Sequence, residues 1–273
     1  QSTDQDLFAK PGYKRQLSGR LHQTCLIFDL SQGLPSRRGL AFLTCTRARM
    51  KLRTPQAILF DLDGTLADTA PDLAGAVNQL RIARGLEPTD YELLRPTASA
   101  GARGLIGAAF GLTPQDAEYP ELRDAFLKNY EASIAVESRL FDGITELLAQ
   151  LQEQGIVWGI VTNKVSYLTD RLVPQIGLDH AACVISGDTA GHPKPHPAPL
   201  FEAAKRIGID PEHCWYVGDD LRDIQAGQAA GMTTIAAGWG YCGNIAPASW
   251  NADALAESPE QLFTLIGREN RLT

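Results

Sequence analysis

Cysteine is scarce in this sequence of 273 residues, and no two cysteines form a Cys-x-x-Cys pair. The five that occur stand far apart, at Cys25, Cys45, Cys183, Cys214 and Cys242. Their odd number and wide spacing argue against a disulfide framework and against a zinc site, because both need grouped thiols. Isolated thiols fit a reducing compartment, so we expect a cytoplasmic protein.

Long apolar runs are also missing, since no stretch approaches the roughly 20 residues that a membrane helix needs. Basic residues are in deficit, with 25 Lys and Arg against 32 Asp and Glu, for a formal net charge of −7. This balance argues against a broad basic surface for nucleic acid. We expect neither nucleic acid nor a membrane as a partner. An acidic enzyme for an anionic substrate must gather positive charge locally, through a metal, a lysine or helix N-termini.

Residues 1–49 differ in composition from the rest of the chain. They hold eight Lys or Arg and three Asp, a net charge of +5, whereas the remainder holds 17 Lys or Arg against 29 Asp or Glu, a net charge of −12. The segment has little periodicity and lacks the order of a secretory signal. We expect it to be a poorly structured extension that adds nothing to the chemistry, with Met50 as the natural start.

The most informative stretch is residues 60–65, Phe-Asp-Leu-Asp-Gly-Thr. It ends the apolar run 57–60, which is typical of a buried strand, and Gly64 then allows a sharp turn. Acids at the carboxyl end of a parallel strand lie where open α/β sheets bind ligands. There Asp61 and Asp63 can hold a divalent cation, or supply a nucleophile beside an acid/base. Two solvated acids in a turn are the alternative.

Residues 71–140 are expected to be helical. Apolar side chains recur at helical spacing, and Gly85 and Gly111 end the first two stripes; the stripes are Leu73, Val77, Leu80, then Leu105, Ile106, Ala109, then Leu122, Phe126, Tyr130, Ile134. Because no strand pattern interrupts them, we interpret this stretch as a helical insert between the first strand and the rest of a sheet. Helices packed directly on the sheet are the alternative, although they would need an unusually long crossover.

Beyond residue 143, strand and helix patterns alternate. Short apolar segments typical of strands are separated by helical stripes; the segments are 156–161, 183–185, 215–217 and 233–237. Strands that alternate with helices predict βαβ units and a parallel sheet, and therefore an α/β fold.

Three further groups of candidate residues follow these strands. Thr162 offers a hydroxyl and a backbone N–H to a phosphate oxygen. Lys194 lies in a proline-rich loop whose stiffness would aim its ammonium. Asp219, Asp220 and Asp223 are costly together unless a cation or solvent compensates them. Each has an ordinary alternative, namely a commonplace strand-end threonine, a solvated lysine and acids that cap a helix.

Taken in order, Asp-x-Asp-Gly-Thr at 61–65, Thr162, Lys194 and Gly-Asp-Asp-x-x-Asp at 218–223 resemble the four motifs of the haloacid dehalogenase superfamily. The resemblance covers about residues 55–270. It implies a doubly wound, parallel-sheet, Rossmann-like core made of residues 50–65 and 141–273. It also implies a helical C1 cap at residues 66–140, inserted after the first strand, and Mg²⁺ as the cofactor.

The resemblance also implies a role for each motif residue. Asp61 would attack phosphorus and form an aspartyl-phosphate, while Asp63 would protonate the leaving alkoxide and then help to deprotonate the attacking water. Thr162 and Lys194 would hold the phosphoryl group, and Lys194 would offset the charge of Asp61. Superfamily members that cleave carbon–halogen bonds or phosphonates lack the second aspartate, so Asp63 favours a phosphatase or a phosphomutase.

The same resemblance assigns the metal and substrate contacts. Mg²⁺ would be held by Asp61, the carbonyl oxygen of Asp63 and Asp219. Asp220 and Asp223 would lie next to these ligands without binding the metal themselves. Contacts to the substrate would come from Gly64, Thr65, Asn163 and Arg103.

The substrate has to be inferred from the cap. Arg103 lies in a glycine-rich stretch, residues 99–105, that could reach over the site and bind a substrate carboxylate or hydroxyls. A flexible loop with a solvated arginine is the alternative. Overall the chain resembles bacterial phosphoglycolate phosphatases. The Gly-Ala-Arg stretch at residues 101–103, together with residues 161–164, 218–224 and 239–241, also resembles N-acetylmuramic acid 6-phosphate phosphatases.

We therefore expect a phosphomonoesterase for a small phosphorylated metabolite, with phosphoglycolate first and a phosphosugar second. A phosphomutase, which needs a cap that retains product and excludes water, is a third alternative. From a different class, a non-catalytic binding module remains open. The sequence does not distinguish a monomer from a dimer.

Overall fold

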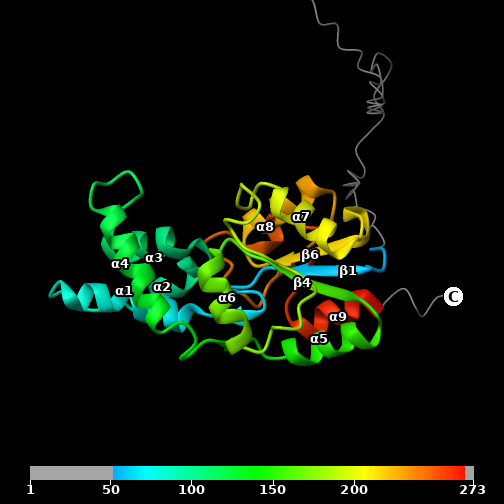
Figure 1. Ribbon diagram of the computed structural model, residues 1–273, viewed down its shortest axis with the longest axis horizontal. Coiled ribbons are helices and arrows are strands. Elements are labelled where there is room, and N and C mark those ends of the chain that lie inside the picture. The colour runs from blue at the N-terminus through cyan, green and yellow to red at the C-terminus, as the bar shows by residue number, and fades with distance from the viewer. Residues whose placement is uncertain (1–51, 268–273) are drawn as a thin grey trace, which may run out of the picture. The chain divides into compact units, whose positions relative to one another are not determined.

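The computed structural model describes residues 52–267, and the predicted extension at residues 1–49 lies outside them. Six strands form one parallel sheet in the order β5–β4–β1–β6–β7–β8 (Figure 1). They are β1 (Ala57–Phe60), β4 (Val157–Val161), β5 (Val184–Ile185), β6 (Cys214–Gly218), β7 (Thr233–Ala237) and β8 (Ala254–Ala256). The chain starts at the middle of the sheet and winds outward first to one edge and then to the other. The predicted doubly wound α/β class is confirmed.

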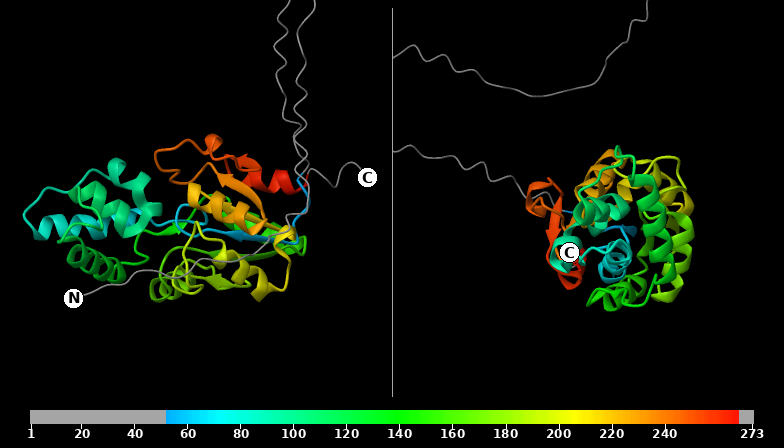
Figure 2. Two further views of the ribbon diagram at one scale, coloured as in Figure 1. Left: turned by 90° about the horizontal axis from the view of Figure 1, so that it is seen from above. Right: turned by 90° about the vertical axis from the view of Figure 1, so that its left-hand side faces the viewer.

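Helices cover both faces of this sheet (Figures 1 and 2). Helices α7 and α8 pack on one face and α5 and α9 on the other, while α6 follows β4; their bounds are α5 (Ile144–Glu153), α6 (Ser166–Gln175), α7 (Ala198–Ile207), α8 (Leu221–Ala230) and α9 (Pro259–Gly267). Strand β1 shows how the core divides. Leu59 packs with side chains of α7 and α8, whereas Ile58 and Phe60 belong to the cluster that includes α5 and α9. Both faces of β1 are buried, so its sequence is apolar throughout.

The predicted helical insert lies between β1 and β4. Its helices are α1 (Ala70–Ala83), α2 (Tyr91–Leu94), the 3₁₀ helix η1 (Arg95–Ala100), α3 (Gly101–Phe110) and α4 (Tyr119–Ala132). Both figures place these helices beyond the carboxyl ends of the strands. Their inward side chains, among them Leu105, Phe126 and Tyr130, are fully buried. The insert therefore covers the edge of the sheet where the candidate residues follow their strands.

The chain enters and leaves the insert through a short ribbon. Strand β2 (Ala67–Asp68) pairs antiparallel with β3 (Arg139–Leu140). The prediction of uninterrupted helix up to residue 140 is wrong at this point, because a strand of two residues is too short to show periodicity. We propose this ribbon as the boundary between the cap and the core.

Two buried groups hold the insert beside this ribbon. The Asp72 carboxylate in α1 accepts hydrogen bonds from the backbone N–H groups of Glu137 and Ser138 at 2.8–3.1 Å. The Tyr241 hydroxyl accepts from the N–H groups of Thr69 and Ala70, at 2.7 and 2.9 Å, where α1 begins. These contacts satisfy backbone donors that would otherwise be buried without partners. No helix within residues 52–267 is long and apolar enough to cross a membrane.

The close packing of β4 generates a matched pair of stability predictions. A Cβ on Gly159 would lie 2.7 Å from Cys183 Sγ and 3.1 Å from Leu59 Cδ2, whereas a Cβ on Gly75 in α1 would meet no described atom within 4 Å. Gly159→Ala should lower the free energy of unfolding by about 1–3 kcal/mol through overpacking. Gly75→Ala should raise it by about 0.5–1 kcal/mol, because alanine favours helix. Urea denaturation measures both, and shifts of the same sign would contradict this account of the packing.

Candidate active site

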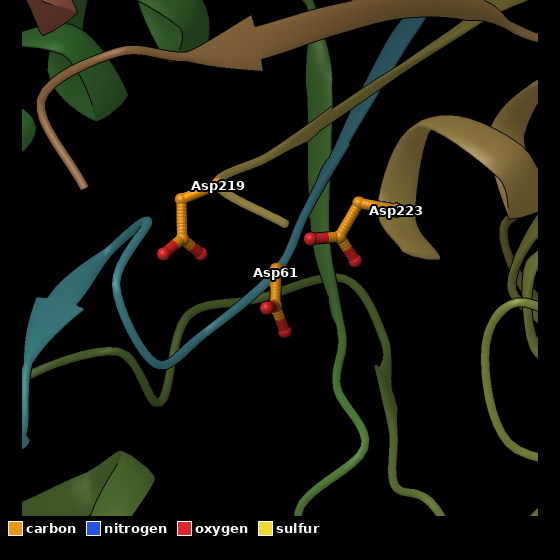
Figure 3. A group of neighbouring side chains, drawn as sticks. All are labelled: Asp61, Asp219 and Asp223. Carbon is orange, nitrogen blue, oxygen red and sulfur yellow. The ribbon is translucent and has the colours of Figure 1, made fainter. Parts of the chain in front are cut away.

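The site forms where neighbouring parallel strands end. Asp61 follows β1 and Asp219 follows β6, and Phe60 pairs in register with Val217. Asp223 joins them from the first turn of α8, and Figure 3 shows the three side chains gathered at this edge. One carboxylate oxygen of each lies within 4.8 Å of the other two, and all three residues are buried. Three buried acids so close together require positive charge nearby.

Lys194 supplies part of that charge. Its Nζ lies 2.8 Å from Asp61 Oδ1 and 2.7 Å from Asp223 Oδ1, and it also donates to the Val161 carbonyl and the Tyr216 hydroxyl. Only 3% of Lys194 is exposed, so the alternative of a solvated lysine is wrong.

Asn163 holds the loop that presents this lysine. Its Oδ1 accepts from the Lys194 backbone N–H at 2.8 Å, and its Nδ2 donates to the Lys194 carbonyl at 2.9 Å. Because Asn163 follows β4 and Thr162, the sheet itself sets the position of the Lys194 backbone. Asn163 thus has a structural role in addition to its place in the cavity wall.

Asp219 is held by donors from three parts of the chain. Thr65 Oγ1 donates to its Oδ1 at 3.1 Å, and the Tyr241 N–H and Ser99 Oγ donate to its Oδ2 at 3.0 and 2.9 Å. Gly64 adopts φ +86°, and a Cβ there would overlap the Asp219 carboxylate. The structure therefore places Gly64 and Thr65, which were predicted to contact the substrate, against Asp219.

The electrostatics fit a divalent cation. Burial raises the pKa of Asp61 to about 7, although Lys194 lowers it, and burial followed by the charge of Asp61 raises the pKa of Asp219 to about 8. Around the site, five carboxylates face three cations, which leaves a net charge of −2 if all are ionised; they are Asp61, Asp63, Asp219, Asp220, Asp223 and Lys164, Lys194, Arg222. One divalent cation bound to carboxylate oxygens balances this charge.

Asp223 is the least available member of the acidic group. Its Oδ1 contacts Lys194 and the Tyr216 hydroxyl, and its Oδ2 accepts from the Asp220 N–H at 3.1 Å. Both oxygens are thus engaged, which supports the expectation that Asp223 stands behind the metal ligands. Asp220 likewise caps α8 and pairs with Arg222.

Lys164 is a site residue that the sequence analysis missed. Its Nζ lies 2.9 and 3.2 Å from the two oxygens of Asp63, and 4.6 Å from the centre of the Tyr130 ring in α4. Thr69 Oγ1 also donates to Asp63, at 2.5 Å. Asp63 is thus held between the sheet edge and the insert. The available signal was the position of Lys164 directly after Thr162 and Asn163.

A cavity of about 110 Å³ lies between the sheet edge and the insert. It is lined by Asp61, Asp63, Ala98, Ser99, Ala100, Gly101, Thr162, Asn163, Lys164, Lys194, Asp220, Arg222 and Asp223. Most of the predicted site residues thus meet around one space. Asp219 is fully buried next to Ser99 and does not line it.

The structure does not bring Arg103 into this cavity. Residues 95–110 are η1 followed directly by α3, so successive side chains point in different directions around a helix. Only residues 98–101 of this stretch face the cavity, and Arg103 is exposed. The predicted contact of Arg103 with a substrate is therefore not supported by its position. Arg222, which the sequence analysis did not select, lines the cavity instead.

The fold and the site together define a doubly wound α/β protein with a buried acidic centre, able to hold a cation, at the carboxyl edge of its sheet. A comparison with known protein families agrees with this description of the fold. The family model described as haloacid dehalogenase-like hydrolase matches residues 58–237. The chain belongs to this family, which confirms the resemblance seen in the motifs.

Individual relatives share most of their length with this chain. A protein of Xanthomonas campestris pv. campestris named phosphoglycolate phosphatase is 48% identical over 217 residues, covering 78% of this chain and 96% of that protein. A protein of Pseudomonas aeruginosa named N-acetylmuramic acid 6-phosphate phosphatase is 40% identical over 222 residues, covering 81% and 97%. A crystal structure described as a predicted phosphoglycolate phosphatase from Haemophilus somnus is 26% identical, with a TM-score of 0.68, covering 78% of this chain and 99% of that one.

The raised pKa values predict how a divalent cation should stabilise the protein at different pH. Asp61 and Asp219 retain protons in the folded protein above their ordinary pKa of 3.8. Without metal, the folded state therefore binds more protons than the unfolded chain, and stability falls as pH rises from about 4 to 8. Cation binding needs both groups ionised, so its stabilising effect should grow over the same range. The increase in Tm on addition of about 10 mM Mg²⁺, which is about ten times the Kd of a weak site, should be larger at pH 8.5 than at pH 6. Equal increases, or an unchanged effect in Asp219→Asn, would contradict this account of the site.

Proposed function

We propose that the protein is a Mg²⁺-dependent phosphomonoesterase that forms an aspartyl-phosphate on Asp61. The observation that best supports this proposal is the buried ion pair between Lys194 Nζ and Asp61 Oδ1, at 2.8 Å. Both residues line the cavity, together with Thr162 and Asp63. A carboxylate approaches a phosphate dianion only where cations screen the repulsion, and this site concentrates them. Mg²⁺ would be held by Asp61, the Asp63 carbonyl oxygen and Asp219, and would offset the charge of the phosphoryl oxygens.

The residues support a two-step displacement. In the first step the Asp61 carboxylate forms a bond to phosphorus, the bond to the alkoxide breaks, and Asp63 gives that alkoxide its proton. In the second step a water gives a proton to Asp63 and its oxygen bonds to phosphorus, which releases Asp61 and inorganic phosphate. Thr162 and Lys194 position the phosphoryl group throughout.

For the substrate, we propose phosphoglycolate. The small volume of the cavity, about 110 Å³, supports a compact substrate such as this one. The relative at 48% identity carries the same substrate in its name.

N-acetylmuramic acid 6-phosphate is the second candidate. It is favoured by the relative at 40% identity, of which this chain covers 97%. This substrate is much larger than phosphoglycolate and would need an enlarged cavity. Movement of the insert about the β2–β3 ribbon would provide the space. A phosphomutase would instead need an insert that stays closed over its product.

We propose that the reaction takes place in the cytoplasm. The cysteines within the described part of the chain, Cys183, Cys214 and Cys242, are free thiols, and reducing compartments keep thiols in this state.

A substrate screen on the purified protein tests the proposed function. Phosphate release should be fastest with 2-phosphoglycolate among a few dozen phosphorylated metabolites, and EDTA should abolish it. Asp61→Asn should abolish turnover with Tm little changed, because the amide has nearly the same shape but cannot attack phosphorus. A folded Asp61→Asn variant with comparable kcat would refute the assignment. If the wild-type protein does not hydrolyse p-nitrophenyl phosphate, that result would favour a non-catalytic binding module.

The proposed role of Asp63 predicts a dependence on the leaving group. Asp63→Asn should reduce kcat about 10²–10⁴-fold for alkyl phosphates, which need a proton on the departing oxygen. The reduction should be clearly smaller for p-nitrophenyl phosphate, whose leaving group is stable as an anion. Asp61→Asn serves as the control, since it should affect both esters equally. An equal loss for the two esters in Asp63→Asn would argue against Asp63 as the acid.

A further inference from the structure

Arg222 connects the core to the insert at the edge of the cavity. It lies in the first turn of α8, and its Nε and Nη2 donate to the two oxygens of Asp220 at 2.7 and 2.9 Å. Nη2 also donates to the carbonyl oxygen of Ser99 in η1, at 2.8 Å. Ser99 in turn donates to Asp219. The guanidinium is therefore fixed next to the segment that covers the cavity.

The three cations that line the cavity differ in their free hydrogen-bond donors. The Lys194 ammonium already contacts two carboxylates, a carbonyl and a hydroxyl. The Lys164 ammonium is paired with both oxygens of Asp63 and lies over the Tyr130 ring. Arg222 has five N–H donors, and its Nη1 has no hydrogen-bond partner among residues 52–267. Arg222 thus retains a planar, directed donor for a ligand.

Asp220 keeps this donor oriented. Burial alone would raise the pKa of Asp220, but the hydrogen bonds and charge of Arg222 outweigh it and hold that pKa below its usual value. Asp220 is consequently a carboxylate at neutral pH that pairs with Arg222 through two parallel hydrogen bonds. Such a pair balances its own charge in a half-buried place, and Nη1 remains available because Nε and Nη2 are engaged by Asp220 and Ser99.

We propose that Arg222 binds the carboxylate of a small phosphorylated acid through Nη1. This inference rests on the proposed function, because the phosphoryl group must lie against Asp61, Thr162 and Lys194. In phosphoglycolate a single carbon separates the ester oxygen from the carboxylate, so the carboxylate stays within the same small cavity. Ser99 and Arg222, which are hydrogen-bonded to each other, both line that cavity. Arg222 is therefore a specificity-determining residue and not part of the phosphoryl chemistry.

Two substrates of similar size test this assignment on the full chain. One is 2-phosphoglycolate, and the other is 2-hydroxyethyl phosphate, which replaces the carboxylate with a neutral hydroxymethyl group. In Arg222→Ala, kcat/KM for 2-phosphoglycolate should fall roughly 10- to 200-fold, mainly through KM, as expected for the loss of a hydrogen bond to a charged group. The value for 2-hydroxyethyl phosphate should change less than about threefold, which is close to the ordinary scatter of such measurements. Arg222→Lys should recover little, because an ammonium lacks the planar fork.

Two arginine variants serve as matched controls. Arg123→Ala removes an exposed arginine of α4 that pairs with its neighbour Asp124, and it should leave both substrates unaffected. Arg103→Ala tests the competing assignment. A loss confined to 2-phosphoglycolate in Arg103→Ala, but not in Arg222→Ala, would overturn the proposal in favour of Arg103.

The remaining outcomes are equally decisive. Equal losses on both substrates in Arg222→Ala would show that Arg222 only holds Ser99 in place, and would overturn the proposal. If Arg222→Ala does not fold, Arg222→Lys and Arg222→Gln, compared at matched Tm, decide the same question. A wild-type protein that hydrolyses p-nitrophenyl phosphate but does not prefer 2-phosphoglycolate would refute the substrate itself. If every Arg222 variant keeps the preference for 2-phosphoglycolate, that result would refute only the role proposed for Arg222.

Discussion

The ammonium of Lys194 lies between Asp61 and Asp223, where almost no water reaches it. Through the same nitrogen it contacts the end of β4 at the Val161 carbonyl, so one charge joins two strands and a helix. Removing one partner of a buried ion pair typically costs about 3–5 kcal/mol, because the other charge is left without compensation. Without this lysine the Asp61 and Asp223 carboxylates would lose their shared buried partner, and Asn163 secures the lysine's loop by two backbone hydrogen bonds.

The fold could be predicted to the extent that local patterns repeat. Apolar segments and helical stripes located β1, β4, β6 and β7 within about one residue, and Gly111 does end α3 in a left-handed conformation. The ribbon β2–β3 escaped prediction because strands of two residues have no period. Strand β8 and helix α9 were also missed. Strand β8 has only three residues and is defined by its pairing with β7, and α9 is a short helix that follows it with the buried residues Leu262 and Ile266.

The site was predictable where residues follow strands and not where they meet across the fold. The parallel register brings the residues after β1, β4 and β6 to one edge, so Asp61, Thr162 and Asp219 could be placed from their order along the chain. Lys164 and Arg222 became visible only through contacts with Asp63 and with the backbone of Ser99, more than 100 residues away. Arg103 shows the converse. A glycine-rich stretch suggested a loop, but helix geometry directs its side chain to the surface.

The β2–β3 ribbon is the narrow passage through which the chain enters and leaves the helices that cover the cavity. Since the six-stranded sheet keeps all its pairings on one side of that ribbon, substitutions at Ala98, Ala100 or Gly101 can reshape the cavity, whereas Ser99 also supports Asp219. The wall of the cavity thus comes partly from the insert, at residues 98–101, and partly from the core, at Arg222. A cavity wall assembled from two distant parts of the chain can change at either part independently, and relatives at 40% and 48% identity to this chain carry different substrate names.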